Sequence, residues 1–150
     1  MKKIYKRIFQ ILLTLLFANF SVNAQNADLI TKHKWITASS VAATPIDLNK
    51  KSKASTDLMI QSPPCTWDDV FIFKEKNILI VNDNKDVCVQ RPVEPGSWMI
   101  LNDSLTINFS TQYSVKFKIL ELDNSKMVLL AKMPFIPGGV NVTTSFKVAD

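Results

Sequence analysis

Apolar and polar residues alternate with a period of two along much of this 150-residue chain. The clearest run is 140–148, where Val, Val, Thr, Phe and Val at every second position alternate with Asn, Thr, Ser and Lys. Successive side chains of a strand point to opposite faces, so this run predicts a strand with one buried and one exposed face. Shorter runs of the same kind recur between Pro, Asn and Asp residues. The sequence therefore predicts an all-β fold.

The expected strands follow one another as antiparallel hairpins joined by polar turns. They lie at 35–40, 70–73, 78–81, 88–90, 98–101, 105–109, 115–122, 127–131 and 140–148. Such a series forms an up-and-down meander with one apolar face, and this face must be covered. Closure into a barrel of about eight or nine strands covers it and removes the exposed sheet edges. A two-sheet sandwich is the alternative architecture.

One long polar segment, 42–64, interrupts this regular pattern and is rich in Ser, Thr, Lys and Asp. We expect it to be a surface excursion near the mouth of the barrel, with a short strand or turn at 58–60. Three lysines lie within it, Lys50, Lys51 and Lys53. Because no apolar periodicity surrounds them, a solvated loop is favoured over a site for phosphate or another polyanion.

Residues 1–24 have the organisation of a secretory signal peptide. Basic residues at 2–7 precede an apolar run at 8–17 and a small-residue motif at 22–24. The apolar run is about half the roughly 20 residues that a membrane-spanning helix needs, which favours a cleaved leader over a retained anchor. We expect cleavage after Ala24 and a single domain at 25–150, periplasmic or secreted. No cysteine stands at the junction, so a lipoprotein is not expected.

Removal of this leader would eliminate most of the net charge. Four of the 18 basic residues lie in 1–24, where no acidic residue occurs, so 14 basic residues remain against 13 acidic ones. A net charge of +1 provides no global positive field. The sequence therefore predicts no nucleic-acid partner.

The chain offers few residues for catalysis or for metal binding. Its three glycines cannot form either common phosphate-binding loop. His33, the single histidine, and two cysteines cannot by themselves complete a standard zinc site, and we expect His33 to be exposed in a terminal loop. Asp68 and Asp69 are adjacent, and adjacent strand residues point to opposite sides of a sheet. We therefore predict a protein that is not an enzyme and has no metal or cofactor.

The cysteines and tryptophans have expected structural positions. In an oxidising compartment Cys65 and Cys88 most simply form a disulfide, whereas a nucleophilic thiol would need a base that only His33 could provide. Trp35 and Trp98 begin strands, which favours positions at the closed end of the barrel over stacking against a ligand. Trp67 is expected to pack over the disulfide or over the mouth of the barrel.

One alternating row is the expected inward face of a strand. Val115, Phe117 and Ile119 alternate with lysines. In a barrel this small such side chains either fill the core or line a pocket, depending on their size.

Several short motifs keep a fixed order along 29–130. They lie at 29–30, 33–35, 65–73, 88, 96–98 and 102–107. Their order and spacing resemble the exported bacterial lipocalin-like domain family. The resemblance implies a small antiparallel barrel of the calycin type, with Gly96 of the G-x-W motif at a barrel end. Where that family has its first G-x-W glycine, this chain has His33.

Two functions of different classes fit such a barrel. The first is a binding protein that holds a small hydrophobic molecule in the barrel interior. The alternative is a protein–protein interaction module, such as an inhibitor, immunity factor or assembly accessory, with a filled interior and contacts through the loops at 42–64 and 134–139. A cavity of a few hundred cubic ångströms would favour the first function. A filled barrel with an apolar patch on the loops would favour the second.

The predicted disulfide between Cys65 and Cys88 can be tested on the secreted chain. Reduction should raise the mass of the denatured protein by two hydrogens, and should lower the free energy of unfolding by about 3 kcal/mol because the closed loop no longer restricts the unfolded chain. Intact-mass spectrometry before and after reduction measures the first effect, and urea unfolding measures the second. An unchanged mass would mean that the two thiols are free.

Overall fold

The computed structural model describes residues 25–48, 53–82, 95–111, 113–133, 136 and 138–149. Its strands are β1 (Lys34–Ile46), β2 (Ser55–Asp57), β3 (Val70–Lys74), β4 (Ile78–Asn82), β5 (Gly96–Leu101), β6 (Ser104–Asn108), β7 (Ser114–Leu122), β8 (Lys126–Met133) and β9 (Val140–Val148). Two short 3-10 helices, η1 (Met59–Gln61) and η2 (Pro64–Thr66), lie between β2 and β3. The expected leader at 1–24 and the expected strand at 88–90 lie outside the described residues.

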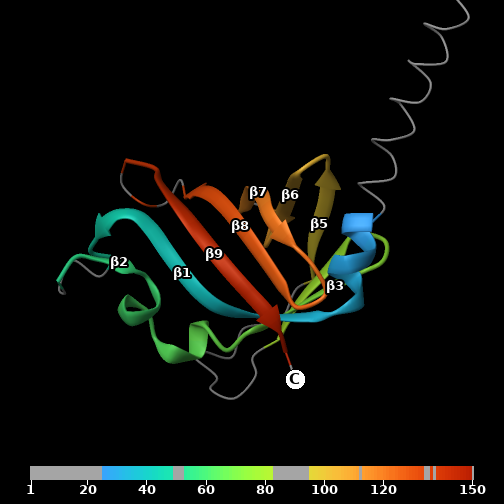
Figure 1. Ribbon diagram of the computed structural model, residues 1–150, viewed down its shortest axis with the longest axis horizontal. Coiled ribbons are helices and arrows are strands. Elements are labelled where there is room, and N and C mark those ends of the chain that lie inside the picture. Colours follow the sequence, from blue (N-terminus) through green and yellow to red (C-terminus); the bar gives the residue numbers. More distant parts are fainter. Residues whose placement is uncertain are drawn as a thin grey trace, which may run out of the picture.

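The sheet closes because β1 pairs with two strands that are far apart in the meander (Figure 1). The start of β1 pairs with β3, with Trp35 opposite Phe71, and β1 also pairs with β9, where Ser40 lies opposite Thr144. Every neighbouring pair is antiparallel. The result is a closed barrel of eight strands with β2 as an additional strand on β1. The predicted barrel is confirmed, and the chain does not adopt the two-sheet alternative.

The alternating sequence pattern gives the barrel its apolar interior. In β8 the side chains of Met127, Leu129 and Ala131 are buried, whereas Lys126 and Lys132, which flank this run, are exposed. The same alternation recurs in β6, β7 and β9. Every second side chain is buried on the inner face of the sheet, and this burial provides most of the free energy that holds the strands in this register.

The two ends of the barrel differ. Turns at 75–77, 102–103 and 123–125 join successive strands at one end. This end is here called the helix end, after the helix at 25–32 that precedes β1 there. The connections that follow β1, β6 and β8 lie at the opposite end, here called the loop end, because neighbouring strands are antiparallel.

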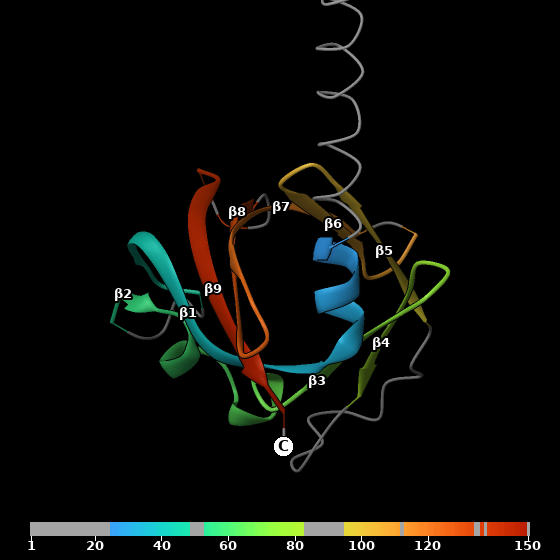
Figure 2. The ribbon, with the colours of Figure 1, turned by 45° about the vertical axis from the view of Figure 1, so that its right-hand side comes forward.

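An α-helix at 25–32, which the sequence pattern did not predict, packs at the helix end. Figure 2 shows this helix, in blue, inside the curve of the sheet. Ile30 of the helix is fully buried, and its carbonyl oxygen accepts a hydrogen bond from Trp35 Nε1 at 3.0 Å. Short helices are stabilised mainly by tertiary packing, which alternation in the sequence does not reveal.

His33, at the junction of this helix with β1, is half-buried rather than exposed as expected. Its ring packs edge-on against Trp35, with the ring centroids 5.7 Å apart. The expectation of an exposed terminal loop was wrong because the helix folds the preceding residues back over the barrel.

The described parts of the polar segment 42–64, residues 42–48 and 53–64, contain more regular structure than its composition indicates. Its first five residues continue β1 to Ile46, and Ala42 pairs with Val142 of β9. A register shift between Thr37 and Ser39 bends β1, as an irregular strand position does. Beyond β1, the expected element at 58–60 is a 3-10 turn that follows β2. Among the described residues no helix is both long and apolar enough to span a membrane.

The turn between β7 and β8 is stabilised by one carboxylate. Asp123 Oδ1 accepts hydrogen bonds from Ser125 N at 2.7 Å, Ser125 Oγ at 2.9 Å and Lys126 N at 2.9 Å. These bonds, led by the one from the Ser125 backbone, lower the pKa of Asp123 from its ordinary value of 3.8. A lowered pKa in the folded state means that the charged form stabilises the fold.

We expect Asp123→Ala to lower the urea midpoint at neutral pH, because it removes the acceptor of all three bonds. The stabilisation is complete above the ordinary value of 3.8 and is lost as the pH falls through the lower folded value, so the difference from the wild type should shrink in acid. Asp123→Asn, which keeps an uncharged acceptor, is the control. A difference that is independent of pH would contradict this assignment.

Candidate functional site

The interior of the barrel is packed at the helix end and hollow toward the loop end. Large side chains fill the helix end; these are Ile30, Trp35, Phe73, Leu79, Leu105 and Met127. A pocket of about 270 Å³ lies beyond them. It is lined by Thr37, Ser40, Leu48, Leu58, Ser62, Thr66, Trp67, Phe71, Ile107, Phe109, Phe117, Met133, Ile136, Val142, Thr144 and Phe146.

Small hydroxyl side chains on β1 and β9 leave this space unfilled. Thr37, Ser40 and Thr144 are buried inward-facing residues, where other strands place phenylalanine or leucine. The hydroxyls of Ser40 and Thr144 lie 3.3 Å apart and form a hydrogen bond. A buried hydroxyl without a partner costs about 1–3 kcal/mol, so this pairing makes the polar wall tolerable inside an apolar barrel.

Two loops cover the pocket with apolar side chains. Leu58, ahead of η1, and Ile136, between β8 and β9, are both buried and pack with Ala42 and Val142 in one cluster. The cluster therefore forms an apolar cover at the loop end, made of residues that are distant in the sequence.

The excursion that carries Leu58 is held by one buried amide. Gln61 Oε1 accepts a hydrogen bond from Leu48 N at 2.8 Å, and Gln61 Nε2 donates to the carbonyl oxygens of Ile46 at 2.7 Å and Ser55 at 3.2 Å. Leu58 N also donates to the Ser40 carbonyl oxygen at 3.0 Å. These bonds fix the loop against β1 and so keep Leu58 over the pocket.

Comparison with protein families matches residues 33–129 to the lipocalin-like domain. The chain belongs to the lipocalin-like domain family. The matched range ends within β8, so it contains β1 with Ser40 but not β9 with Thr144. No curated protein matches this sequence. Eight-stranded barrels of the lipocalin type have an interior that is filled by side chains or holds one small ligand.

The lipocalin-like barrel places only part of the expected inward row at the pocket. Phe117 lines the pocket. Val115 is buried in the main core and Ile119 is half-buried against it, and neither is a lining residue. The pocket wall that was not predicted comes from β1, β9 and the two covering loops. The alternation in 140–148 predicts which face of β9 is buried, but not that this face lines a pocket, and the isolated apolar residues of the loops carry no periodic signal.

The expected barrel-end residues contact the backbone closely. Trp98 Nε1 donates to the Lys74 carbonyl oxygen at 2.9 Å, close to the β3–β4 turn. A Cβ atom on Gly96 would lie 2.6 Å from the carbonyl oxygen of Asn108, so this position on β5 has room only for glycine. Trp35 Nε1 donates to the Ile30 carbonyl oxygen of the helix at 25–32, as described above. These contacts stabilise the sheet and are not part of the pocket wall.

The expected cysteine pair is only partly described. Cys65 is half-buried in η2, directly before two lining residues, Thr66 and Trp67. Cys88 lies outside the described residues, so the disulfide remains a prediction.

The described part of the pocket wall is neutral. Its residues are apolar or carry hydroxyl groups, apart from the Trp67 indole, and none of these described residues is charged. Across the ranges that the structure describes, no three His, Cys, Asp or Glu side chains form a group that could hold a metal ion.

We expect Gln61→Ala to destabilise the covering loop, because three backbone groups lose their partner. The free energy of unfolding should fall by about 2 kcal/mol, and trypsin should cleave the lysine-rich segment 50–53 faster. Urea unfolding and mass spectrometry of the fragments measure these effects. Thr56→Ala, at an exposed position of β2, is the control. Equal behaviour of the two variants would show that Gln61 does not hold the loop.

Proposed function

We propose that this protein is an exported, non-enzymatic binding protein that holds one small hydrophobic molecule inside its lipocalin-like barrel. The single observation that carries the proposal is the pocket of about 270 Å³ with its largely apolar lining. Apolar side chains that face an open pocket are in contact with water. A ligand of matching shape removes that water, and this stabilises the complex of protein and ligand.

The volume of the pocket restricts the size of the ligand. An apolar cavity of about 150 Å³ is large enough to bind benzene. A pocket of about 270 Å³ therefore has room for a molecule of two fused rings or of similar bulk, but it lies at the low end of ligand-site volumes. Large multi-ring ligands and long, fully enclosed chains do not match this space.

The lining also supports binding over catalysis. General acid–base chemistry needs a titratable side chain within hydrogen-bond reach of the substrate. The residues that line the pocket include no histidine, cysteine, carboxylate or amine. The hydroxyls of Ser40 and Thr144 bond each other and have no base among these residues.

The alternative function, contact with another protein through the loops, rests on a different observation. Ile60 of η1 is 73% exposed, on the segment 42–64, which would be a contact surface under this alternative. Single exposed apolar residues are common on protein surfaces, whereas this alternative also requires a filled barrel. The hollow interior therefore favours ligand binding.

Export through a cleaved signal peptide is part of the proposal and rests on the pattern of residues 1–24. The proposed disulfide between Cys65 and Cys88 fits the same compartment. In such a compartment the barrel would meet small hydrophobic molecules that are poorly soluble in water and would shield one of them.

Binding can be tested with 1-aminonaphthalene, an uncharged two-ring fluorophore whose emission depends on the polarity of its surroundings. We expect saturable binding with a Kd of about 10 µM, given the ordinary binding energy per ligand atom. Thr144→Phe should weaken binding at least tenfold, because the ring would occupy the pocket that Thr144 lines.

Thr143→Phe is the matched control for this experiment. It makes the same substitution one residue earlier in β9, at an outward-facing position, and should leave the Kd unchanged. Circular dichroism and thermal unfolding verify that both variants are folded. No binding to the wild type, or equal loss of binding in both variants, would contradict a ligand site in the barrel.

A further inference from the structure

The three tryptophans of the chain differ in one respect. The indole nitrogens of Trp35 and Trp98 donate to backbone carbonyl oxygens, at 3.0 Å to Ile30 and 2.9 Å to Lys74. Trp67 Nε1 is also shielded from solvent, yet it has no hydrogen-bond partner among the residues that the structure describes. Buried Trp N–H groups are normally paired, so this one donor requires an explanation.

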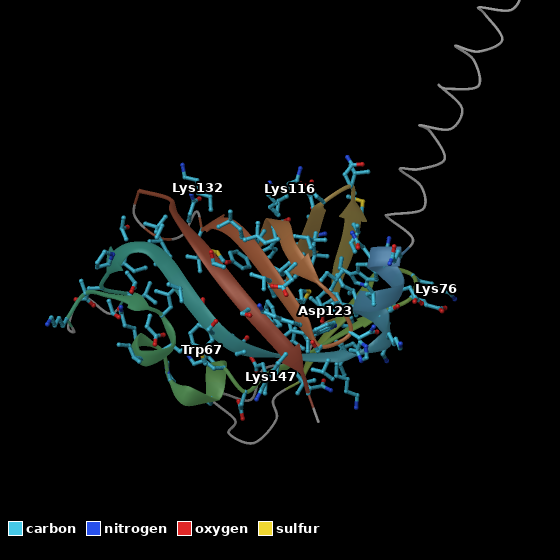
Figure 3. The ribbon with its side chains drawn as sticks, viewed as in Figure 1. Trp67, Lys76, Lys116, Asp123, Lys132 and Lys147 are labelled. Carbon is cyan, nitrogen blue, oxygen red and sulfur yellow. The ribbon has the colours of Figure 1, made fainter. Side chains whose placement is uncertain are left out.

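Trp67 belongs to the wall of the pocket. It follows η2, and Figure 3 labels it beside β1. Trp67 lines the cavity and packs against the apolar cover formed by Leu58 and Ile136. Its N–H group is thus a buried donor on a residue that a bound molecule would touch.

Among the described residues of the wall, Trp67 Nε1 is the one solvent-shielded polar side-chain atom without a hydrogen-bond partner; the hydroxyl oxygens of Thr37 and Ser62, which also line it, are not both shielded and unpaired. Ser40 and Thr144 bond each other, and Thr66 Oγ1 donates to the Pro63 carbonyl oxygen at 2.7 Å. A ligand oxygen that enters this pocket would therefore gain most from the indole of Trp67, which loses no existing bond by donating to it.

The lining also restricts the charge of the ligand. A carboxylate or an ammonium group would lose its hydration in the pocket and would meet no opposite charge among the lining residues. An uncharged acceptor, such as a ketone, ester or ether oxygen, avoids that penalty.

We propose that Trp67 Nε1–H is the polar recognition point of the pocket, and that the ligand is a compact, uncharged, apolar molecule with one hydrogen-bond acceptor. This inference rests on the proposed ligand-binding function and specifies its ligand class. Trp67 acts here as a specificity residue, because shape and apolar contact hold any hydrocarbon of this size while the indole selects those that carry an acceptor.

Two bicyclic probes of nearly the same shape test the inference, the hydrocarbon tetralin and its ketone 1-tetralone. Their Kd values follow from displacement of 1-aminonaphthalene, in the wild type and in Trp67→Phe, which keeps an aromatic ring without the donor. We expect the ratio of the 1-tetralone Kd to the tetralin Kd to rise about five- to tenfold in Trp67→Phe, the ordinary worth of one hydrogen bond.

Nuclear magnetic resonance provides a readout that does not require the variant to bind. The three indole N–H groups give separate proton–nitrogen correlations, and Trp67→Phe identifies the signal of Trp67 by its loss. We expect 1-tetralone to shift the Trp67 proton downfield and tetralin to leave it nearly unshifted. The signals of Trp35 and Trp98 should stay in place with both probes.

The outcomes separate this inference from the proposed function. If neither probe binds the wild type, the proposed function fails. If both bind but Trp67→Phe changes their Kd values by the same factor and the Trp67 signal does not respond to the ketone, only the role of Trp67 is overturned. If 1-naphthoate, a charged bicyclic probe, binds as tightly as 1-tetralone, the restriction to uncharged ligands is wrong.

Discussion

The structure depends on the double pairing of β1. Its residues 34–36 pair with β3 along one edge and its residues 35–42 pair with β9 along the other edge, so a single strand joins the two ends of the meander. Without this closure the apolar face of the sheet would lie open and two sheet edges would be exposed to other chains. Every interior position described above, including the pocket, follows from that closure.

Closure creates an interior, but the sizes of side chains determine what the interior can hold. Leucine, methionine and aromatic residues fill the helix end, and the barrel is solid there. Three hydroxyl-bearing residues, Thr37, Ser40 and Thr144, replace such side chains toward the loop end. Filling that space with larger apolar residues would increase the buried area and remove the polar pair. The interior pocket therefore makes the barrel less stable than a fully packed one would be.

Most of the fold could be predicted from the sequence, because alternation reports directly on which strand face is buried. The hairpins around 102–103 and 123–125 are examples, since polar turn residues separate two alternating runs. The helix at 25–32 could not be predicted in this way, because its stability comes from contact of Ile30 with residues of the barrel. The end of β1 was also missed, since Ala42 becomes a core residue only through its pairing with Val142.

The site could be predicted only in part for a related reason. Phe117 stands in a recognisable inward row, whereas Leu58 and Ile136 are single apolar residues in polar or irregular segments. Their burial depends on loops that fold back over the barrel, and Gln61 fixes one of these loops by bonds to distant backbone groups. Nothing in local sequence reports such long-range contacts. That the indole nitrogen of Trp67 has no partner among the described residues is likewise visible only when the surrounding atoms are placed.

The initial helix and the last strand meet at the same end of the barrel. Ala149 N donates to the Lys34 carbonyl oxygen at 2.9 Å, directly after the helix at 25–32, while Leu58 and Ile136 cover the opposite end. Both ends of the described chain are therefore remote from the pocket cover. If the protein were attached to a fusion partner, a tether or a solid support near residue 25 or residue 149, the cover of the pocket would lie at the end of the barrel opposite the attachment.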